Sequence, residues 1–329
     1  DEAQDVGKEK YSKDFKPMGS TTNCTTVHYG TTWDDSTLLE EVKQANLELE
    51  RRDGVKRHFR YDWEEVAKYV PEYKAYVEKE RERLGENHPL FLTQYRLLPI
   101  RGGGGFLDVQ QRAQLQGEHA RQRHAESGKV YVAGIDLAGE AEETDGVLSG
   151  RSRHDSTVVT IGELDYSSVD EIVREPVVRI VEHYRWTGVK HSGLYARLAD
   201  IVTKVWRCRK IVVDATGVGE PVASFLRKAC GTRVMPFKFT QRSKSELGFN
   251  LLAAVNGGRV KVYRGDGSCD YKDLFREMEL AKSAYRANQT MNFYVDAAQG
   301  HDDFLMSLAL TVEAARLYEP RGAKGEERL

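Results

Sequence analysis

The sequence has few cysteines and no long apolar segment. These absences argue against a protein held together by zinc or disulfides and against a membrane-spanning protein. Its 329 residues include four cysteines whose spacing fits neither a zinc motif nor a disulfide framework: Cys24, Cys208, Cys230 and Cys269. No apolar run approaches the length of a membrane span, about eighteen residues. The acidic, polar N-terminus has no signal-peptide character. We therefore expect a cytoplasmic protein with reduced cysteines.

Nucleotide-binding motifs are also missing. No Gly-x-x-x-x-Gly-Lys-Ser/Thr stretch is present, so we expect no ATP hydrolysis by these residues alone. Gly217 and Gly219 begin a pattern typical of dinucleotide binding, but Val222 occupies the position of the third glycine. A dinucleotide site is therefore not expected.

Two aspartates stand where predicted strands end. Asp136 closes the apolar run from Val130 to Leu137, and Asp214 closes the run from Lys210 to Asp214. A single strand-end Asp is more typical of a turn. Open sheets, however, place their chemistry at the carboxyl ends of strands, so the pair favours a functional site where the two acids lie side by side.

A third acidic position opens a C-terminal helix. Asp302 and Asp303 begin it, and Asp303 shares its face with Met306 and Leu310, whereas Asp302 is the more natural cap. An acid that faces the core is costly unless something neutralises it. Hard divalent cations bind carboxylate clusters, and paired ions about 3.5–4 Å apart catalyse hydrolysis in two-metal nucleases. The three positions together therefore predict a metal site.

The order of elements from Lys129 onward predicts an α/β fold. Seven strands are expected, at Val130 to Leu137, Ser156 to Gly162, Val177 to Tyr184, Lys210 to Asp214, Arg233 to Phe239, Arg259 to Tyr263 and Met291 to Val295. Three of them precede the first helix, which indicates a mixed sheet. We expect its first three strands to be antiparallel and its later strands to follow crossover helices.

The first part of the chain is expected to be mostly helical. After a strand-and-loop stretch of thirty-odd residues, helices are predicted from Thr37 to Arg51 and from Tyr61 to Arg83, the second interrupted at Pro71. Four glycines at 102–105 then precede a polar helical segment from Leu107 to Ser127. We place a domain boundary between residues 127 and 128 and expect a disordered tail at about 319–329.

The chain has, in this order, a strand that ends at Asp136, a later strand that ends at Asp214 and a helix that begins at His301-Asp302-Asp303. This arrangement resembles the ribonuclease H-like nuclease domain of large terminase subunits. These subunits are the DNA-packaging motors of tailed bacteriophages. The resemblance implies a ribonuclease H-like mixed sheet flanked by helices in residues 128–329.

The N-terminus extends the resemblance over the whole chain. Asp1-Glu2 resembles the end of a Walker B motif, and Gly30-Thr31-Thr32 resembles the ATPase coupling segment that follows it. Residues 1–127 would then be the C-terminal remnant of a P-loop ATPase domain with a helical linker. We expect the chain to begin midway through the motor, so that ATPase activity belongs to the full-length protein.

The resemblance implies a metal-dependent endonuclease, a hydrolase that cuts double-stranded concatemeric viral DNA with two Mg²⁺ or Mn²⁺ ions. Asp136 would bridge both ions, Asp214 and Asp303 would each hold one, and Asp302 would be an outer or alternative ligand. His301 could assist the site, although a capping or surface role explains it equally well. Implied partners are the small terminase subunit and the portal protein, on which the full-length protein would form a ring, in the host cytoplasm.

DNA contacts must come from local basic patches, because the net charge is only −2. No acidic residue occurs between Arg227 and Ser245. This stretch supplies the predicted phosphate contacts, Arg227, Lys228, Arg233, Lys238, Arg242 and Lys244. A solvated basic face without a ligand is the alternative.

Two other functions remain open. The chain could be a docking or regulatory module that binds DNA, portal or small terminase without cutting, although its intact acids argue against this. A resolvase or transposase would share the fold and the acids, but it has no place for the motor-like N-terminus. The long loop from Gly139 to Arg153 could gate DNA or simply be mobile. His154 and Asp155 at its end could add a ligand or a general base, but a turn before a strand explains them as well.

Overall fold

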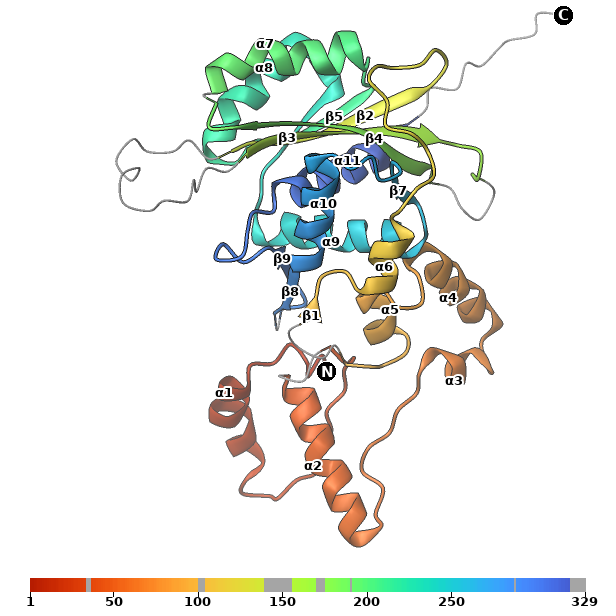
Figure 1. The fold of residues 1–329 in the computed structure, drawn as a ribbon. Coiled ribbons are helices and arrows are strands. Elements are labelled where there is room, and N and C mark those ends of the chain that lie inside the picture. Colours follow the sequence, from red (N-terminus) through yellow and green to blue (C-terminus); the bar gives the residue numbers. More distant parts are fainter. Residues whose placement is uncertain are drawn as a thin grey trace, which may run out of the picture. The chain divides into compact units, whose positions relative to one another are not determined.

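The computed structural model describes residues 1–33, 37–99, 104–138, 156–169, 175–189, 191–286 and 288–319. They form two compact units, each built from separated parts of the chain (Figure 1). Unit 1 comprises Asp1–Leu107, Lys244–Gly257 and Ala281–Tyr294, and unit 2 comprises Asp108–Ser243, Gly258–Leu280 and Val295–Leu329. The loop from Gly139 to Arg153, His154, Asp155 and residues 320–329 lie outside the described residues. The boundary between residues 127 and 128 stays a prediction.

Unit 1 is mainly helical. Its helical segments are α1 (Lys8–Lys10), η1 (Tyr11–Phe15), η2 (Lys16–Gly19), α2 (Leu38–Asp53), α3 (Trp63–Ala67), α4 (Pro71–Leu84) and α5 (Pro89–Gln94). The Thr37 hydroxyl caps α2 by accepting from the Glu40 N–H at 3.3 Å, and α2 ends at Gly54, whose φ of 73° suits glycine. The predicted interruption at Pro71 is confirmed, because α3 ends at Ala67 and α4 begins at Pro71. The strand expected near the N-terminus is wrong, because Lys8–Gly19 is helical and its first part has no Gly or Pro to break a helix.

A small antiparallel sheet also belongs to unit 1. Its strands are β1 (Gly104–Gly105), β8 (Lys282–Tyr285) and β9 (Met291–Tyr294), in the order β1-β8-β9. The strand predicted at 291–295 therefore exists, but it does not complete the larger sheet. It pairs instead with β8, which directly precedes it, and such local hairpin pairing needs only a short loop.

Unit 2 contains a six-stranded mixed sheet of order β6-β5-β2-β3-β4-β7. Its strands are β2 (Val130–Asp136), β3 (Ser156–Asp165), β4 (Val177–Thr187), β5 (Lys210–Asp214), β6 (Val234–Phe237) and β7 (Val260–Val262). β2, β3 and β4 are antiparallel neighbours, whereas β5 runs parallel to β2, β6 to β5 and β7 to β4. The predicted mixed sheet is confirmed.

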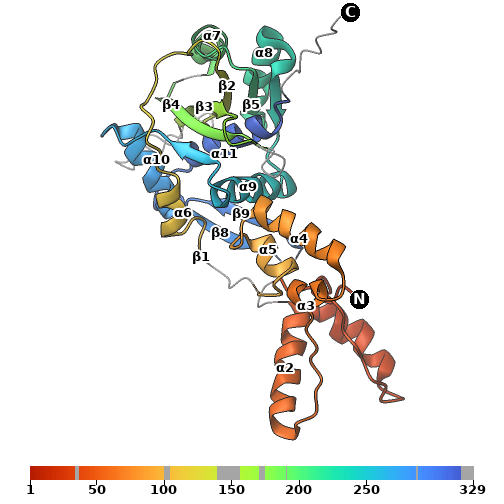
Figure 2. The same cartoon turned by 90° about the vertical axis from the view of Figure 1, so that its right-hand side faces the viewer.

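Helices cover both faces of this sheet (Figure 2). α7 (His191–Asp200), η3 (Ile201–Val205) and α8 (Glu220–Cys230) lie on one face, and α10 (Cys269–Leu280) and α11 (Asp303–Arg316) lie on the other. Ile135 and Val213 point towards α7 and α8 and are fully buried with Leu198 and Leu226. Successive strand residues point to opposite faces, so the residue after each of these strand positions points towards α11. α9 (Gln241–Asn256) has residues in both units.

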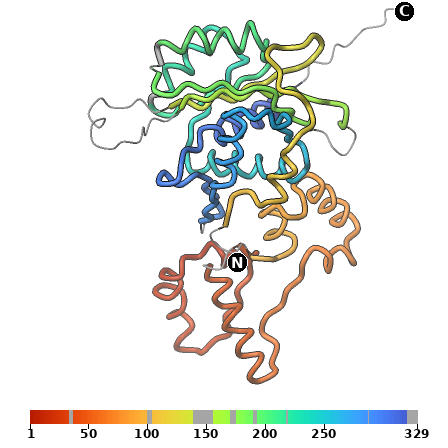
Figure 3. The backbone as a smooth tube through the Cα atoms, viewed as in Figure 1, coloured from red at the N-terminus to blue at the C-terminus, as the bar shows by residue number. Residues whose placement is uncertain are grey.

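The segment from Leu107 to Ser127 is helical only in α6 (Val109–Gln114). Between α6 and β2 the chain, yellow in Figure 3, forms turns, bends and one isolated bridge, from Gln116 to Val262. At Gly117 a Cβ atom would lie 2.6 Å from the carbonyl oxygen of Val262, so the chain passes too close to β7 for a helix. The predicted longer helix is therefore wrong. No helix in the described part of the chain is both long and apolar enough to cross a bilayer.

Candidate active site

Asp136 and Asp214 are neighbours at the carboxyl ends of β2 and β5. The parallel register pairs Ile135 with Val213, so the next residue of each strand is an aspartate, and both point to the α11 face. Each side chain is buried, with 9% exposure. The structure thus brings together the two strand-end acids that the sequence singled out.

α11 brings a third acid to the same place. Asp303 is the first residue of α11, and its Oδ2 accepts a hydrogen bond from the backbone N–H of Ser156, the first residue of β3, at 2.8 Å. The helix approaches the sheet closely because Gly134 has no side chain. A Cβ there would lie 2.2 Å from the carbonyl oxygen of Ser307 and 2.3 Å from the N–H nitrogen of Thr311. This close packing places Asp303 beside the ends of β2 and β3.

Asp302 and His301 lie just before this helix. Asp302 is half-buried and occupies the N-cap position, but its side chain makes no capping hydrogen bond. His301 is exposed. The structure therefore gives the buried position to Asp303, while Asp302 is close enough to raise the pKa of Asp136.

Burial and like charge dominate the electrostatics of these acids. The pKa of Asp136 lies well above its usual range, first because the carboxyl is buried and then because Asp303, Asp214, Asp302 and Glu277 surround it. Burial also raises the pKa of Asp214, although hydrogen bonds from Thr216 oppose the shift, among them its backbone N–H to Oδ1 at 2.8 Å. We call these five acids the carboxylate cluster.

Glu277 is a member of the cluster that the sequence analysis missed. It lies on α10, is 9% exposed, and its Oε2 accepts a hydrogen bond from the backbone N–H of Leu305 at 2.9 Å. Burial, with a smaller contribution from Asp303 and Asp302, raises its pKa to about 9. A signal was present in the sequence, because Glu277 lies among the apolar positions of an amphipathic helix.

The chemistry of the cluster fits a divalent cation, although the acids do not converge on one point. No Lys or Arg among the described residues forms an ion pair with Asp136, Asp214 or Glu277. Carboxylate oxygens are the ligands that Mg²⁺ and Mn²⁺ prefer. Within the described ranges, however, no group of three or more His, Cys, Asp or Glu side chains is arranged to hold an ion. Binding would require the side chains to move towards a common ion.

The predicted phosphate-binding residues occupy different settings. Arg227 and Lys228 are exposed at the end of α8, and Lys238 is exposed and 3.2 Å from Glu220. The guanidinium of Arg233 instead donates to the carbonyl oxygens of Cys230 and Cys208, at 3.1 and 3.4 Å, which ties it to the fold. The remaining two residues lie on α9, Arg242 and Lys244.

The two N-terminal segments of the proposed ATPase remnant lie side by side within unit 1. Ala3, next to the exposed Asp1 and Glu2, donates its N–H to the carbonyl oxygen of Tyr29 at 2.8 Å. The Thr31 N–H donates to the side-chain oxygen of Gln4 at 3.0 Å, and Gly30 leaves room for that side chain, while Thr32 is half-buried. Their assignment to an ATPase domain stays a prediction.

Comparison with known families identifies the part of the chain that contains the carboxylate cluster. A family model described as the terminase RNaseH-like domain matches residues 133–314, more than half of the chain. The chain belongs to this family. The match confirms the ribonuclease H-like fold and the resemblance to terminases, and its range includes every member of the carboxylate cluster.

Several solved terminases are similar to the chain. The large terminase nuclease from the thermophilic phage G20c is 21% identical over 64% of this chain and 97% of that chain, with a TM-score of 0.45. The same nuclease with bound cobalt is 22% identical over 64% and 96%, with a TM-score of 0.46. The HK97 bacteriophage large terminase is 14% identical over 85% of this chain and 61% of that chain, with a TM-score of 0.42. No curated protein matches the chain.

Proposed function

We propose that this terminase chain is a metal-dependent endodeoxyribonuclease that cuts double-stranded concatemeric viral DNA during packaging. The observation that carries the proposal is that Asp136, Asp214 and Asp303 are neighbours at one edge of a ribonuclease H-like sheet. The family match supports a terminase over a resolvase or transposase of the same fold.

Asp136, Asp214 and Asp303 would hold two Mg²⁺ or Mn²⁺ ions, with Asp302 as an alternative ligand. When bound, the ions would activate the attacking water and stabilise the leaving oxygen of the phosphodiester. The chain orients the ligands, because the Ser156 N–H fixes one oxygen of Asp303 and the Thr216 N–H fixes one oxygen of Asp214. The G20c nuclease has been solved with magnesium and with cobalt bound.

The proposal extends to the setting of the reaction. DNA phosphates would contact exposed basic residues, among them Arg227 and Lys228 near the C-terminal end of α8. His301 would assist at the edge of the site. The small terminase subunit and the portal would be partners in the host cytoplasm, and ATP would be used only by the full-length motor.

The test is cleavage of supercoiled plasmid in Mg²⁺, Mn²⁺, Ca²⁺ or EDTA by the wild type, Asp136→Ala and Asp303→Ala. Asp165→Asn is a matched control, because Asp165 ends β3 at the opposite edge of the sheet and pairs with Arg179 at 2.6 Å. We expect nicking and linearisation with Mg²⁺ or Mn²⁺, retained in the control and reduced at least about a hundredfold in both alanine variants.

DNA binding separates the outcomes. Asp136→Ala should bind DNA as well as the wild type, because its loss relieves repulsion among the acids. Cutting that persists in both alanine variants would refute the site assignment. Binding without cutting by the wild type in every metal would favour the docking module.

A further inference from the structure

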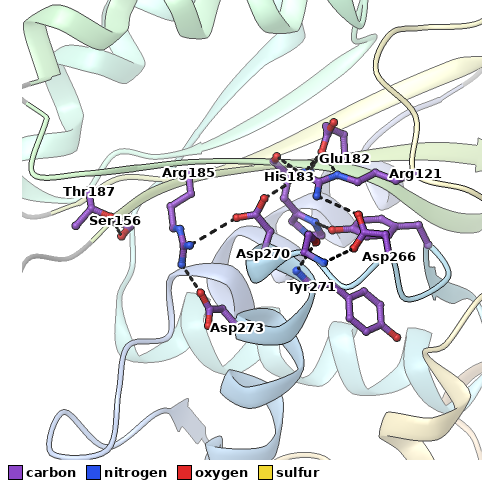
Figure 4. Close-up of polar contacts among 12 residues, drawn as sticks. Arg121, Ser156, Glu182, His183, Arg185, Thr187, Asp266, Asp270, Tyr271 and Asp273 are labelled. Carbon is purple, nitrogen blue, oxygen red and sulfur yellow. Dashed lines mark hydrogen bonds and ion pairs between the residues drawn. The ribbon is translucent and has the colours of Figure 1, made fainter.

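α10 presents three acids along one face. Asp270, Asp273 and Glu277 follow one another at spacings of three and four residues, so they lie in a row along the helix. The first two meet Arg185 of β4, whose guanidinium is 3.8 Å from Asp270 and 2.5 Å from Asp273 (Figure 4). Glu277, one turn further on, meets backbone N–H groups of α11 instead of a cation.

A second arginine strengthens the attachment of α10. Arg121 donates to Asp270 at 3.0 Å, lies 3.3 Å from Asp266 and also pairs with Glu182 of β4. Because Asp266 and Asp270 lie just before and within the first turn of α10, the two arginines fix this end of the helix to β4 (Figure 4). Glu277 therefore extends from an anchored helix.

The same elements hold the residues that follow Asp303. Arg185 lies over the ring of Phe304, with its guanidinium carbon 5.4 Å from the ring centroid, and Glu277 accepts from the N–H of Leu305. The first N–H groups of a helix have no partner within it, and Asp302 supplies no side-chain capping bond here. Glu277 provides this bond from outside the helix.

We propose that Glu277 is a positioning residue of the nuclease: its hydrogen bond to Leu305 fixes the first turn of α11 and so holds Asp303 in the carboxylate cluster. The role in cleavage rests on the proposed function, whereas the role in ordering α11 does not. The two arginines thus connect β4 to α10, and Glu277 connects α10 to α11. Removing the acceptor should therefore loosen Asp303 without removing any ligand.

The test compares Glu277→Gln, which keeps an oxygen acceptor, with Glu277→Ala and Glu277→Met, which do not. Met preserves the side-chain volume if the Ala variant does not fold, and Glu279→Ala is the control, since Glu279 is exposed on the same helix. Amide hydrogen exchange is measured in EDTA for the first turn of α11. We expect exchange about tenfold or more faster in the Ala and Met variants and near wild type in the Gln variant and the control.

Mn²⁺ titration of cleavage gives the second readout. The Ala and Met variants should need about 10–100-fold more Mn²⁺ for half-maximal cleavage, with a smaller change in kcat, and the Gln variant should restore the wild-type requirement. Unchanged exchange in Ala and Met would overturn the proposal. A Gln variant with normal exchange and the full loss of activity would also overturn it, because Glu277 would then act through its charge. If the wild type cuts nothing, the proposed function fails and the exchange result still decides the role of Glu277.

Discussion

The α11 face of the six-stranded sheet carries two polar groupings that balance charge in different ways. In the first, here called the arginine cluster, Arg121 and Arg185 pair with four acids, Glu182, Asp266, Asp270 and Asp273. In the carboxylate cluster, Asp136, Asp214 and Glu277 form no ion pair with a described Lys or Arg, and the pKa of each is raised. Acids of α10 belong to both clusters, but the two arginines pair only with those of the arginine cluster.

This difference separates a structural role from a chemical one. Acids that exist only to hold a fold are normally paired when they are buried, as Glu182 of the arginine cluster is. Acids kept together without cations raise the free energy of the folded protein, and a divalent ion would reverse that cost. The comparison yields four predictions, from the largest expected effect to the smallest.

Arg121→Met should lower the free energy of unfolding by about 3 kcal/mol, because it leaves Glu182 and Asp270 without their shared cation in a mostly buried place. Chemical denaturation measures the change. Lys204→Met is the control: its pair with Asp200 has side chains 74% and 56% exposed, so about 0–0.5 kcal/mol is expected. Equal effects of the two substitutions would remove the distinction between the clusters.

Gly134→Ala should cost about 2 kcal/mol or more, because the new Cβ would lie 2.2 Å from the backbone of Ser307 and push α11 away from β2. The carboxylate cluster should suffer with it, since Asp303 moves with α11. Gly193→Ala is the matched control: its Cβ would meet only Val189, at 4.0 Å, within α7, and alanine there should be neutral or stabilising. Thermal unfolding and plasmid cleavage report both effects. Unchanged cleavage in Gly134→Ala would show that Asp303 does not need this close packing.

Much of the site could be predicted because its acids belong to strong local patterns. Asp136 and Asp214 end β-rich apolar runs, and the parallel register needed to align them follows from the α/β order of elements. The apolar stripe that Asp303 shares with Met306 and Leu310 favours Asp303 over Asp302, and the structure buries this stripe. These inferences needed only periodicity and chain order.

The parts that sequence missed depend on distant contacts. Glu277 joins the cluster because α10 packs against α11, and no local pattern specifies that neighbour. The predicted helix beyond Gln114 failed because backbone groups there found partners in other elements, such as the Gln122 N–H bonded to the carbonyl oxygen of Val181 at 3.0 Å. The composition of β9 predicts a strand, whereas its partner β8 is not predicted from the sequence.

His183, at the edge of the arginine cluster, should make stability depend on pH. Burial, and next the charge of Arg121, lowers its pKa from 6.5 to about 3, while Asp266 opposes the shift and Tyr263 is bonded to the ring. The unfolded chain therefore binds a proton that the folded protein does not. Stability is fully present above pH 6.5 and is lost as pH falls towards 3, at up to about 1.4 kcal/mol per pH unit.

Urea denaturation at pH 6.5, 5.5 and 4.5 measures this slope for the wild type and for His183→Phe. The free energy of unfolding of the variant should depend less steeply on pH, by the contribution of one bound proton, whatever its value at pH 6.5. His124→Gln is the control, because His124 is exposed. Parallel curves for the wild type and His183→Phe would mean that His183 does not resist protonation in the folded protein.

The carboxylate cluster should respond in the opposite sense when Asp136 is replaced. Because the pKa of Asp136 is raised, the folded protein loses stability as pH rises through that pKa. At pH 8 in EDTA, Asp136→Asn should therefore be more stable than the wild type by roughly 1 kcal/mol. Mg²⁺ should raise the melting temperature of the wild type and leave that of the variant nearly unchanged. Asp165→Asn should instead lower the melting temperature slightly. Hydrogen bonds from Ser167 lower the pKa of Asp165, so its ionised carboxylate stabilises the folded protein. If Asp136→Asn melts below the wild type in EDTA, then Asp136 is a stabilising group like the acids of the arginine cluster, and the contrast between the two clusters does not hold.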